Sequence, residues 1–313
     1  MAIDKKFINL FLNATSKAAI AAHHLVGKND KIASDKAAVD AMRHELNQLN
    51  INGKIVIGEG ELDDAPMLFI GEKLGTTIGP NLDIAVDPLE GTNFVAKNLP
   101  GALSVMAVAE KGNLFNAPET YMEKISAKIN EKSIVDLDYS VKKNIFNLSE
   151  YLNKKPESIT ACIMDRPRHR DIINQLHVLG VNIKLITDGD VSGALLVTDD
   201  KYGVDIFLGI GGGPEGVLAS AALDTFECSF QGRFLFHTEK DKRRANKMGI
   251  TNLSKKYELD EIVKGDSIFC ATGITSGDLV SGIRTENNKF ISETFVTHKS
   301  TGLKKIIKKV VNR

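Results

Sequence analysis

The chain has 313 residues, of which 42% are hydrophobic and 26% are charged, an ordinary balance for a globular protein. Its 40 lysines and arginines match its 40 aspartates and glutamates, so the net charge is zero. This neutrality argues against a general nucleic-acid-binding surface, and an anionic substrate would need local positive charge or a metal.

The cysteines and the first helix indicate a cytoplasmic protein. Cys162, Cys228 and Cys270 lie far apart and form no CxxC pair, so we expect reduced thiols. Apolar side chains recur at helical spacing up to Leu25, which favours an amphipathic helix over a signal peptide. No apolar run is long enough to span a bilayer, so we expect no membrane partner.

Apolar periodicity predicts the elements of the first half of the chain. Helices are expected over residues 4–27 and 34–50, the second with Ser34 as its N-cap. A helix over 66–74 would have Pro66 near its first turn and Gly75 just past its end. Strands are expected over 54–57, 83–86, 102–109, 113–117 and 121–129.

A polar, Lys/Asn-rich segment near 128–160, with a helix over 139–153, indicates a boundary between subdomains 1–155 and 156–313. After it, strands and helices alternate, which predicts an α/β layer with a largely parallel sheet. The strands are expected over 159–164, 183–186, 204–208 and 267–271, and the helices over 170–179, 191–197 and 216–223. The basic tail from Lys299 is expected to form a solvated terminal strand or helix.

Carboxylates follow three apolar strands at Gly or Pro turns, in KIVIGEGELDD, DIAVDPLEGT and DIFLGIGGGPEG. Because ligands gather at the carboxyl ends of strands in α/β folds, these acids can converge on one point. Asp87 and Glu90 stand only three residues apart and would repel each other unless a cation neutralised them. Mn²⁺ and Mg²⁺ prefer such oxygen ligands. We therefore expect a divalent-metal site, although acids simply exposed in turns remain the alternative.

The glycine-rich run Gly211–Gly216 allows a different hypothesis. GGGPEG matches GxGxxG between a strand and a helix, the pattern of a dinucleotide-binding oxidoreductase. Glu215 argues against it, since a carboxylate at the helix start would repel the pyrophosphate. A metal-binding scaffold without turnover is a further alternative.

The turn DPLEGT (87–92) resembles the signature of the lithium-sensitive, metal-dependent sugar and inositol phosphatases. Six further segments narrow the resemblance to the class II fructose-1,6-bisphosphatases of bacteria, some of which also act on sedoheptulose 1,7-bisphosphate. They are IVIGEGELDDAPMLFIGEKLG (55–75), NAPETYMEK (116–124), MDRPRH (164–169), TDGDVSGA (187–194), GIGGGPEG (209–216) and FCATGITSGDL (269–279).

The resemblance implies a five-layer αβαβα sandwich, dependence on Mn²⁺ or Mg²⁺, and removal of the 1-phosphate of fructose 1,6-bisphosphate in gluconeogenesis. It also implies a homodimer or homotetramer. By matching motifs, the metal ligands would be Asp35, Glu59, Asp87, Glu90 and Glu215. The residues lining the substrate would be Glu90, Gly91, Thr92, Tyr121, Arg166, Pro167, Arg168, Asp188, Gly189, Asp190 and Gly212.

The chemistry of these side chains predicts a mechanism of the same kind. Thr92 can orient the attacking water, with Asp63 or Glu59 as proton acceptor. Arg166 and Arg168 suit a second, non-reacting phosphate, because guanidinium binds phosphate bidentately; a solvated basic turn is the alternative. The arginine pair also argues against an inositol-phosphate monoesterase. His169 beside them is interpreted as a surface histidine at least as readily as a catalytic one.

Overall fold

The computed structural model describes residues 3–58 and 68–312. Two compact units divide the chain, one formed by Met1–Phe115 with Val263–Arg313 and the other by Asn116–Ile262. This division differs from the boundary near residue 155 that the sequence predicts, because the chain returns to the first unit at Val263.

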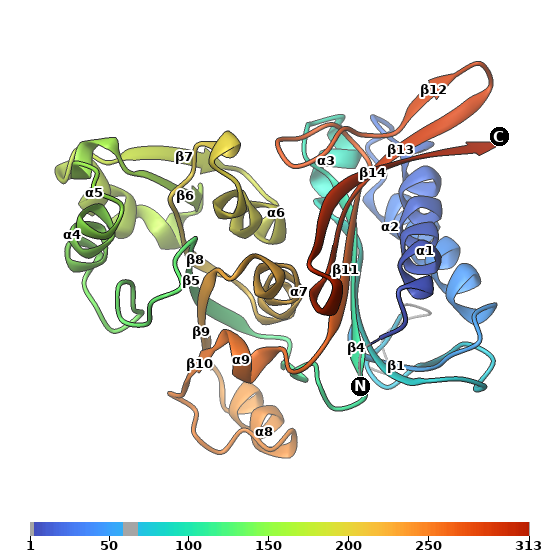
Figure 1. Cartoon of the computed structure of the whole chain (residues 1–313), viewed down its shortest axis with the longest axis horizontal. Coiled ribbons are helices and arrows are strands. Elements are labelled where there is room, and N and C mark those ends of the chain that lie inside the picture. The colour runs from blue at the N-terminus through green and yellow to red at the C-terminus, as the bar shows by residue number, and fades with distance from the viewer. Residues whose placement is uncertain (1–2, 59–67, 313) are drawn as a thin grey trace. The chain divides into compact units, whose positions relative to one another are not determined.

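The first unit is an eight-stranded mixed sheet with helices on one face (Figure 1). The sheet order is β12-β13-β11-β4-β3-β1-β2, with β14 also paired to β13. Buried side chains of α1 and α2, such as Phe11 and Met42, form a core with sheet residues such as Ile84. The elements are α1 (Lys6–His23), α2 (Lys31–Asn47), β1 (Asn52–Ile57), β2 (Lys73–Leu74), β3 (Asn81–Glu90), α3 (Thr92–Lys97), β4 (Leu103–Glu110), β11 (Ser267–Gly273), β12 (Arg284–Glu286), β13 (Lys289–His298) and β14 (Leu303–Asn312).

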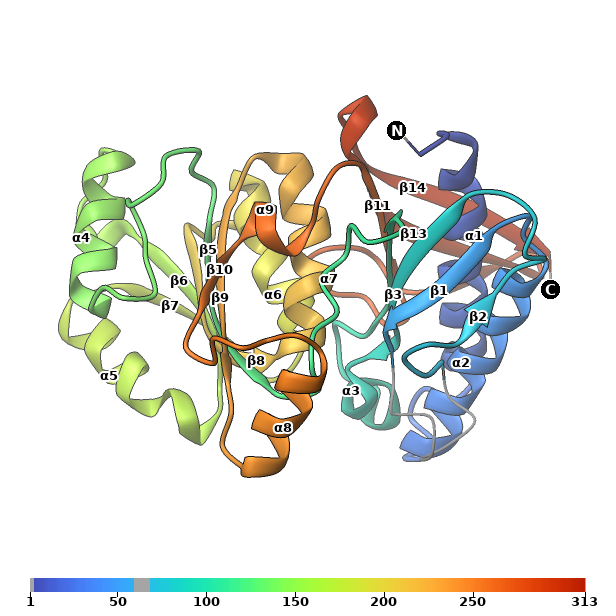
Figure 2. The ribbon, with the colours of Figure 1, turned by 90° about the horizontal axis from the view of Figure 1, so that it is seen from below.

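The second unit is a six-stranded sheet in the order β10-β9-β5-β8-β6-β7. Helices α4 and α5 cover one face, and α6 and α7 lie on the other (Figures 1 and 2). Ile145 of α4 and Leu176 of α5 pack on Ile206 and Leu208 of the sheet. The elements are β5 (Tyr121–Ala127), α4 (Val141–Tyr151), β6 (Thr160–Met164), α5 (Arg170–Val178), β7 (Asn182–Ile186), α6 (Asp190–Leu195), β8 (Ile206–Gly212), α7 (Gly213–Leu223), β9 (Ser229–Leu235), α8 (Glu239–Lys247), β10 (Lys256–Glu258) and α9 (Leu259–Ile262).

The expected α/β class is confirmed, with two layers in the first unit and three in the second. The expected parallel sheet is wrong. Among the described strands, only the pairs β1–β3, β6–β7 and β6–β8 run parallel. A continuous apolar run such as β4 is typical of any strand buried on both faces, so it does not reveal strand direction.

Three local predictions differ from the structure. Helix α2 begins earlier than Ser34, because Asp30 is the N-cap and accepts a 2.9 Å hydrogen bond from the Ala33 amide. The described part of the helix expected over 66–74 contains strand β2 instead. Residues 113–117 form only an isolated bridge, from Leu114 to Val263. The basic tail forms strand β14, one of the two forms expected.

All three cysteines lie in the described part of the chain, where they are buried and form no disulfide. Within the part of the chain that the structure describes, none of the helices is both long and apolar enough to cross a membrane.

Candidate functional site

Strand β3 of the first unit carries Asp87 and Glu90 into a β-bulge. Asp87 lies opposite Val105 of β4, and Glu90 lies opposite Leu103, so three steps along β3 match two along β4. Side chains alternate between faces in a regular strand, and positions three apart would point to opposite sides. The bulge adds one residue to β3, so Asp87 and Glu90 lie opposite Val105 and Leu103. Those two residues are two positions apart on β4 and therefore point to the same face. The two carboxylates therefore lie on the same side of the sheet.

The turn after the bulge depends on glycine. Gly91 has φ 83°, a left-handed conformation that other residues adopt only with strain, and it forms the N-cap of α3. A Cβ on Gly91 would lie 2.8 Å from the Phe94 ring. Thr92 begins α3 and is half-buried. The turn thus places Thr92, at the first position of α3, two residues after Glu90.

The other predicted carboxylates of the first unit are Asp35, Glu59 and Asp63. Asp35 lies inside α2, in its second turn. Glu59 and Asp63 lie outside the described residues. Over residues 3–58 and 68–312, no three His, Cys, Asp or Glu side chains are grouped so that they could hold a metal.

The Asp87–Glu90 pair nevertheless fits a hard divalent cation. Its donors are all carboxylate oxygens, and Glu90 is only 5% exposed. Mg²⁺ and Mn²⁺ typically take one or two protein carboxylates and complete their shell with water and substrate phosphate. A pair of acids on one side of the end of β3 is thus an adequate beginning of such a site.

In the second unit, the two arginines lie in a turn after β6. Pro167 starts a short 3-10 helix, Pro167–His169, with Arg166 as its N-cap. The Arg166 guanidinium lies 3.4 Å from Asp188 Oδ1. Arg168 Nε donates a 2.8 Å hydrogen bond to the Ile210 carbonyl, and its guanidinium lies 5.0 Å from the Tyr121 ring centre. Both arginines keep donors available for an anion, because Arg168 is exposed and Arg166 is half-exposed.

Asp190 begins α6 after Gly189, which has φ 85°. Its carboxylate is ion-paired with Lys124, and both side chains are buried, at 8% and 1% exposed. The second Asp190 oxygen, Oδ1, has no hydrogen-bond partner among the described residues. Asp188 and Asp190 thus differ: the first contacts Arg166 near the surface, and the second is held inside.

The end of β8, directly before α7, lies close to the carboxylates of Asp190 and Glu215. A Cβ on Gly211 would lie 1.9 Å from Asp190 Oδ2, and one on Gly212 would lie 1.9 Å from Glu215 Oε2. The pKa of Glu215 is raised, because surrounding protein excludes water and the nearby Asp190 carboxylate repels its charge, while Lys124 opposes the rise. The absence of side chains at the two glycines therefore lets both carboxylates approach the loop.

Tyr121, Gly212 and Glu215 line one cavity of the second unit, with a volume of ≈ 430 Å³. Tyr121 and Gly212 are paired residues of neighbouring strands β5 and β8, which explains why segments ninety positions apart meet there. The other lining residues are Glu119, Thr120, Pro214, His237 and Asp241.

Sequence reasoning missed Lys124 and His237 and did not predict the burial of His169. Lys124 shares a strand face with the buried Met122 and Ser126, so a lysine on an apolar strand face was an available signal. His169, interpreted as a surface or catalytic histidine, is buried and bonded to backbone atoms through both ring nitrogens. His237 packs edge-on to Tyr121, at 6.3 Å between ring centres, and no pattern marked it.

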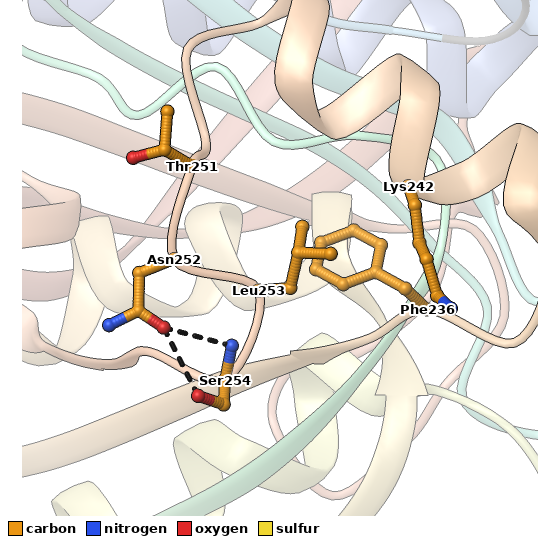
Figure 3. A pocket seen from close by; sticks show the side chains of 6 residues that line it. All are labelled: Phe236, Lys242, Thr251, Asn252, Leu253 and Ser254. Carbon is orange, nitrogen blue, oxygen red and sulfur yellow. Dashed lines mark hydrogen bonds between the residues drawn. The ribbon is translucent and has the colours of Figure 1, made fainter.

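A second hollow of the same unit lies beside α8 and has a volume of ≈ 640 Å³ (Figure 3). Phe236 and Leu253 are its apolar lining residues. Its lysine, Lys242, lies 2.7 Å from Glu239, and Asn252 Oδ1 accepts hydrogen bonds from Ser254. None of its lining residues is a predicted site residue, whereas the cavity at Tyr121 is lined by three of them, Tyr121, Gly212 and Glu215.

Comparison with known proteins agrees with the sequence motifs. The family model described as bacterial fructose-1,6-bisphosphatase, glpX-encoded, matches residues 5–311. The D-fructose 1,6-bisphosphatase class 2/sedoheptulose 1,7-bisphosphatase of Synechococcus sp. (strain JA-3-3Ab) is 40% identical over 319 residues, which cover 94% of this chain and 92% of that protein. A protein of the same description from Synechococcus sp. (strain CC9902) is 42% identical over 298 residues, covering 91% and 89%.

Among solved structures, the inositol monophosphatase from Anabaena (Nostoc) sp. PCC 7120 matches with a TM-score of 0.32 and 16% identity, covering 62% of this chain and 71% of that one. This likeness is too distant to assign a role to any residue.

Proposed function

Because the chain belongs to the family of bacterial, glpX-encoded fructose-1,6-bisphosphatases, we propose that it hydrolyses the 1-phosphate of fructose 1,6-bisphosphate, a step of gluconeogenesis. The family makes the protein a hydrolase of carbohydrate metabolism. The observation that carries the proposal is the bulge that brings Asp87 and Glu90 to one side of β3, next to Thr92. Sedoheptulose 1,7-bisphosphate, which the names of the relatives include, is the second substrate to test.

The family implies a divalent metal cofactor, and we propose that it is Mn²⁺ or Mg²⁺. Asp87 and Glu90 would hold it, and Asp35, Glu59 and Glu215 are the further ligands that the sequence motifs suggest. The metal would neutralise phosphate charge and lower the pKa of a bound water.

The protein's own side chains would orient the substrate. The Thr92 hydroxyl would orient the attacking water, and Asp63 or Glu59 would accept its proton. Arg166 and Arg168 would bind the non-reacting phosphate, because both keep guanidinium donors available in one turn. The substrate would also be lined by Gly91, Tyr121, Pro167, Asp188, Gly189, Asp190 and Gly212.

Two alternatives are less well supported. An inositol-phosphate monoesterase would use the same carboxylates but would not need two arginines for a second phosphate. A dinucleotide-binding oxidoreductase would need the run from Gly211 to accept pyrophosphate, whereas Glu215 lies in the first turn of the following helix. Family membership disfavours both.

We also propose that the protein is cytoplasmic and forms a homodimer or homotetramer.

The deciding experiment is phosphate release from fructose 1,6-bisphosphate by the purified protein, with Mn²⁺, with Mg²⁺ and with EDTA. Sedoheptulose 1,7-bisphosphate and inositol 1-phosphate are assayed in parallel. Metal-dependent release from the fructose ester supports the proposal. Release from inositol 1-phosphate alone would keep the metal site and overturn the substrate and the role of the arginine pair. If no ester were hydrolysed by folded, metal-loaded protein, the proposed activity would be wrong.

A further inference from the structure

The turn that carries the two arginines is hydrogen-bonded to one residue of strand β8, Ile210. The Ile210 carbonyl accepts a 2.8 Å hydrogen bond from Arg168 Nε. The Ile210 amide donates a 2.7 Å hydrogen bond to His169 Nε2. Two consecutive residues of the turn therefore bind both polar backbone groups of a single residue of the strand.

The reason for this contact lies in the sheet. Strands β6 and β8 pair only at Ala161–Ile206 and Cys162–Phe207, so Ile210 lies past the end of their ladder. His169 Nδ1 contacts the carbonyl of Met164, the last residue of β6, at 2.7 Å. The imidazole thus joins the end of β6 to β8 where backbone pairing has stopped. It is 0% exposed, so water cannot substitute for either bond.

These contacts fix the protonation state of the ring. The Ile210 amide can only donate, so Nε2 must be the accepting, unprotonated nitrogen. The Met164 carbonyl can only accept, so Nδ1 must carry the hydrogen. Burial lowers the pKa of His169, and the nearby Arg168 lowers it further, while Asp190 acts in the opposite direction. A neutral imidazole with its hydrogen on Nδ1 is the form that fits.

We propose that His169 is a positioning residue that holds Ile210 and so keeps Arg168 aligned for the second phosphate of the substrate. This inference rests on the proposed function. The Arg168–Ile210 bond leaves the two terminal guanidinium nitrogens of Arg168 for a ligand, while the guanidinium lies near the Tyr121 ring. If the Ile210 backbone were released, the anchor of Arg168 would move with it. The effect should appear in KM more than in kcat, because the second phosphate does not react.

Two substitutions separate the two ring nitrogens. In His169→Gln, the side-chain oxygen can reach the position of Nε2 and accept from Ile210, whereas the contact with Met164 is lost. In His169→Asn, the shorter amide can donate to Met164, whereas the bond to Ile210 is lost. We expect His169→Asn to raise KM for fructose 1,6-bisphosphate by roughly tenfold or more, the loss expected for a misplaced charge-assisted contact, and His169→Gln to raise it less. A purely structural histidine would give both variants the same KM.

The pH dependence provides a second readout. When the pH falls from about 8 to about 5, protonation of His169 should raise the KM of the wild type. The substrate phosphate also titrates in this range, but its effect on KM is the same for every variant. The KM of His169→Gln should therefore rise less than that of the wild type. Equal pH profiles of KM for His169→Gln and wild type would overturn the inference.

A measurement on the wild type remains decisive if the variants fail to fold. NMR spectra of nitrogen-labelled histidine side chains should show His169 with its proton on Nδ1. A proton on Nε2 at neutral pH would overturn the inference. Binding of inorganic phosphate, measured by calorimetry, should be weaker in His169→Asn than in His169→Gln. If the wild type hydrolysed no bisphosphate, the proposed function would fail, yet the tautomer and the phosphate affinities would still test the contact itself.

Discussion

Lys124 and Asp190 form a buried ion pair in the second unit, joining strand β5 to the first residue of helix α6. Lys124 is 1% exposed, so its ammonium depends on Asp190 to compensate for the lost hydration. Lys124 Cε also lies 3.4 Å from where a Cβ on Gly216 would be, so the lysine runs along the start of α7. One cation is thereby shared electrostatically by two carboxylates, those of Asp190 and Glu215.

Replacing Lys124 by Met should destabilise the protein by about 3–5 kcal/mol, because Asp190 would be left as a buried charge without its partner. Urea denaturation of the two proteins measures this difference. The double variant K124M/D190N should recover much of the stability, since both charges are then removed.

Lys128→Met, at the residue that follows the end of β5, is the matched control. Lys128 pairs with Asp200, but the two side chains are 48% and 95% exposed, so its loss should change stability little. Equal effects of K124M and K128M would contradict the importance of the buried pair.

Asp87→Asn and Glu90→Gln should each lower kcat by several orders of magnitude with the fold retained, because each removes a charged oxygen ligand while keeping the side-chain shape. Turnover and circular dichroism are measured together. Glu286→Gln, on the exposed strand β12, serves as control and should behave like the wild type. Near-normal turnover in both Asp87→Asn and Glu90→Gln would refute the proposed metal site.

Thr92→Ala should reduce kcat more than it raises KM. The proposed role of the hydroxyl is to orient the attacking water, an interaction that matters most in the transition state. Steady-state kinetics with fructose 1,6-bisphosphate gives both constants. The opposite pattern, with a raised KM and unchanged kcat, would make Thr92 a binding residue only.

Gly212→Ala should lower turnover with little backbone strain. Gly212 has φ −70°, which alanine adopts freely, but the new Cβ would occupy the position of Glu215 Oε2. Gly203→Ala is the reciprocal control: its Cβ would meet nothing within 4 Å, but φ is 65°. That control should cost about 1–2 kcal/mol of stability and leave kcat unchanged. Full activity of Gly212→Ala would show that Glu215 need not stay where it lies.

The stability of the protein should fall on acidification through the range between the lowered pKa of folded His169 and its ordinary value of about 6.5. In that range the unfolded chain binds a proton that the folded one does not, so stability rises with pH. Urea unfolding at several pH values measures the slope. His23, whose pKa is also lowered by burial, contributes in the same direction. The slope should therefore decrease in His169→Asn without vanishing, and an unchanged slope would contradict a neutral, buried His169.

The sequence revealed the site motifs better than their spatial arrangement. The run into Asp87 predicted strand β3 and its acidic end, because an apolar strand followed by a turn is a local pattern. The bulge could not be predicted, since it depends on the register with β4. The burial of His169 could not be predicted either, because its partner Ile210 lies forty-one positions away and the contact involves backbone atoms.

The division into units was missed for a similar reason. Strand β11 pairs with β4 along seven residues, from Ser267–Ala109 to Gly273–Leu103, although more than 150 positions separate the two strands. No local signal marks such a return, and the polar segment near 128–160 was taken as the boundary although it lies inside the second unit.

The return of the chain to the first unit after Ile262 has a consequence for biosynthesis. Every strand of the six-stranded sheet is encoded between Tyr121 and Glu258, so a ribosome delivers that sheet complete while β11, β13 and β14 are still to be translated. Until Ser267–Gly273 emerges, the buried strand β4 has one edge without its partner, and unpaired apolar edges are prone to aggregate. The nascent protein thus passes through a stage at which the second unit can be folded but the first unit cannot. This is the stage at which a chaperone would be needed most.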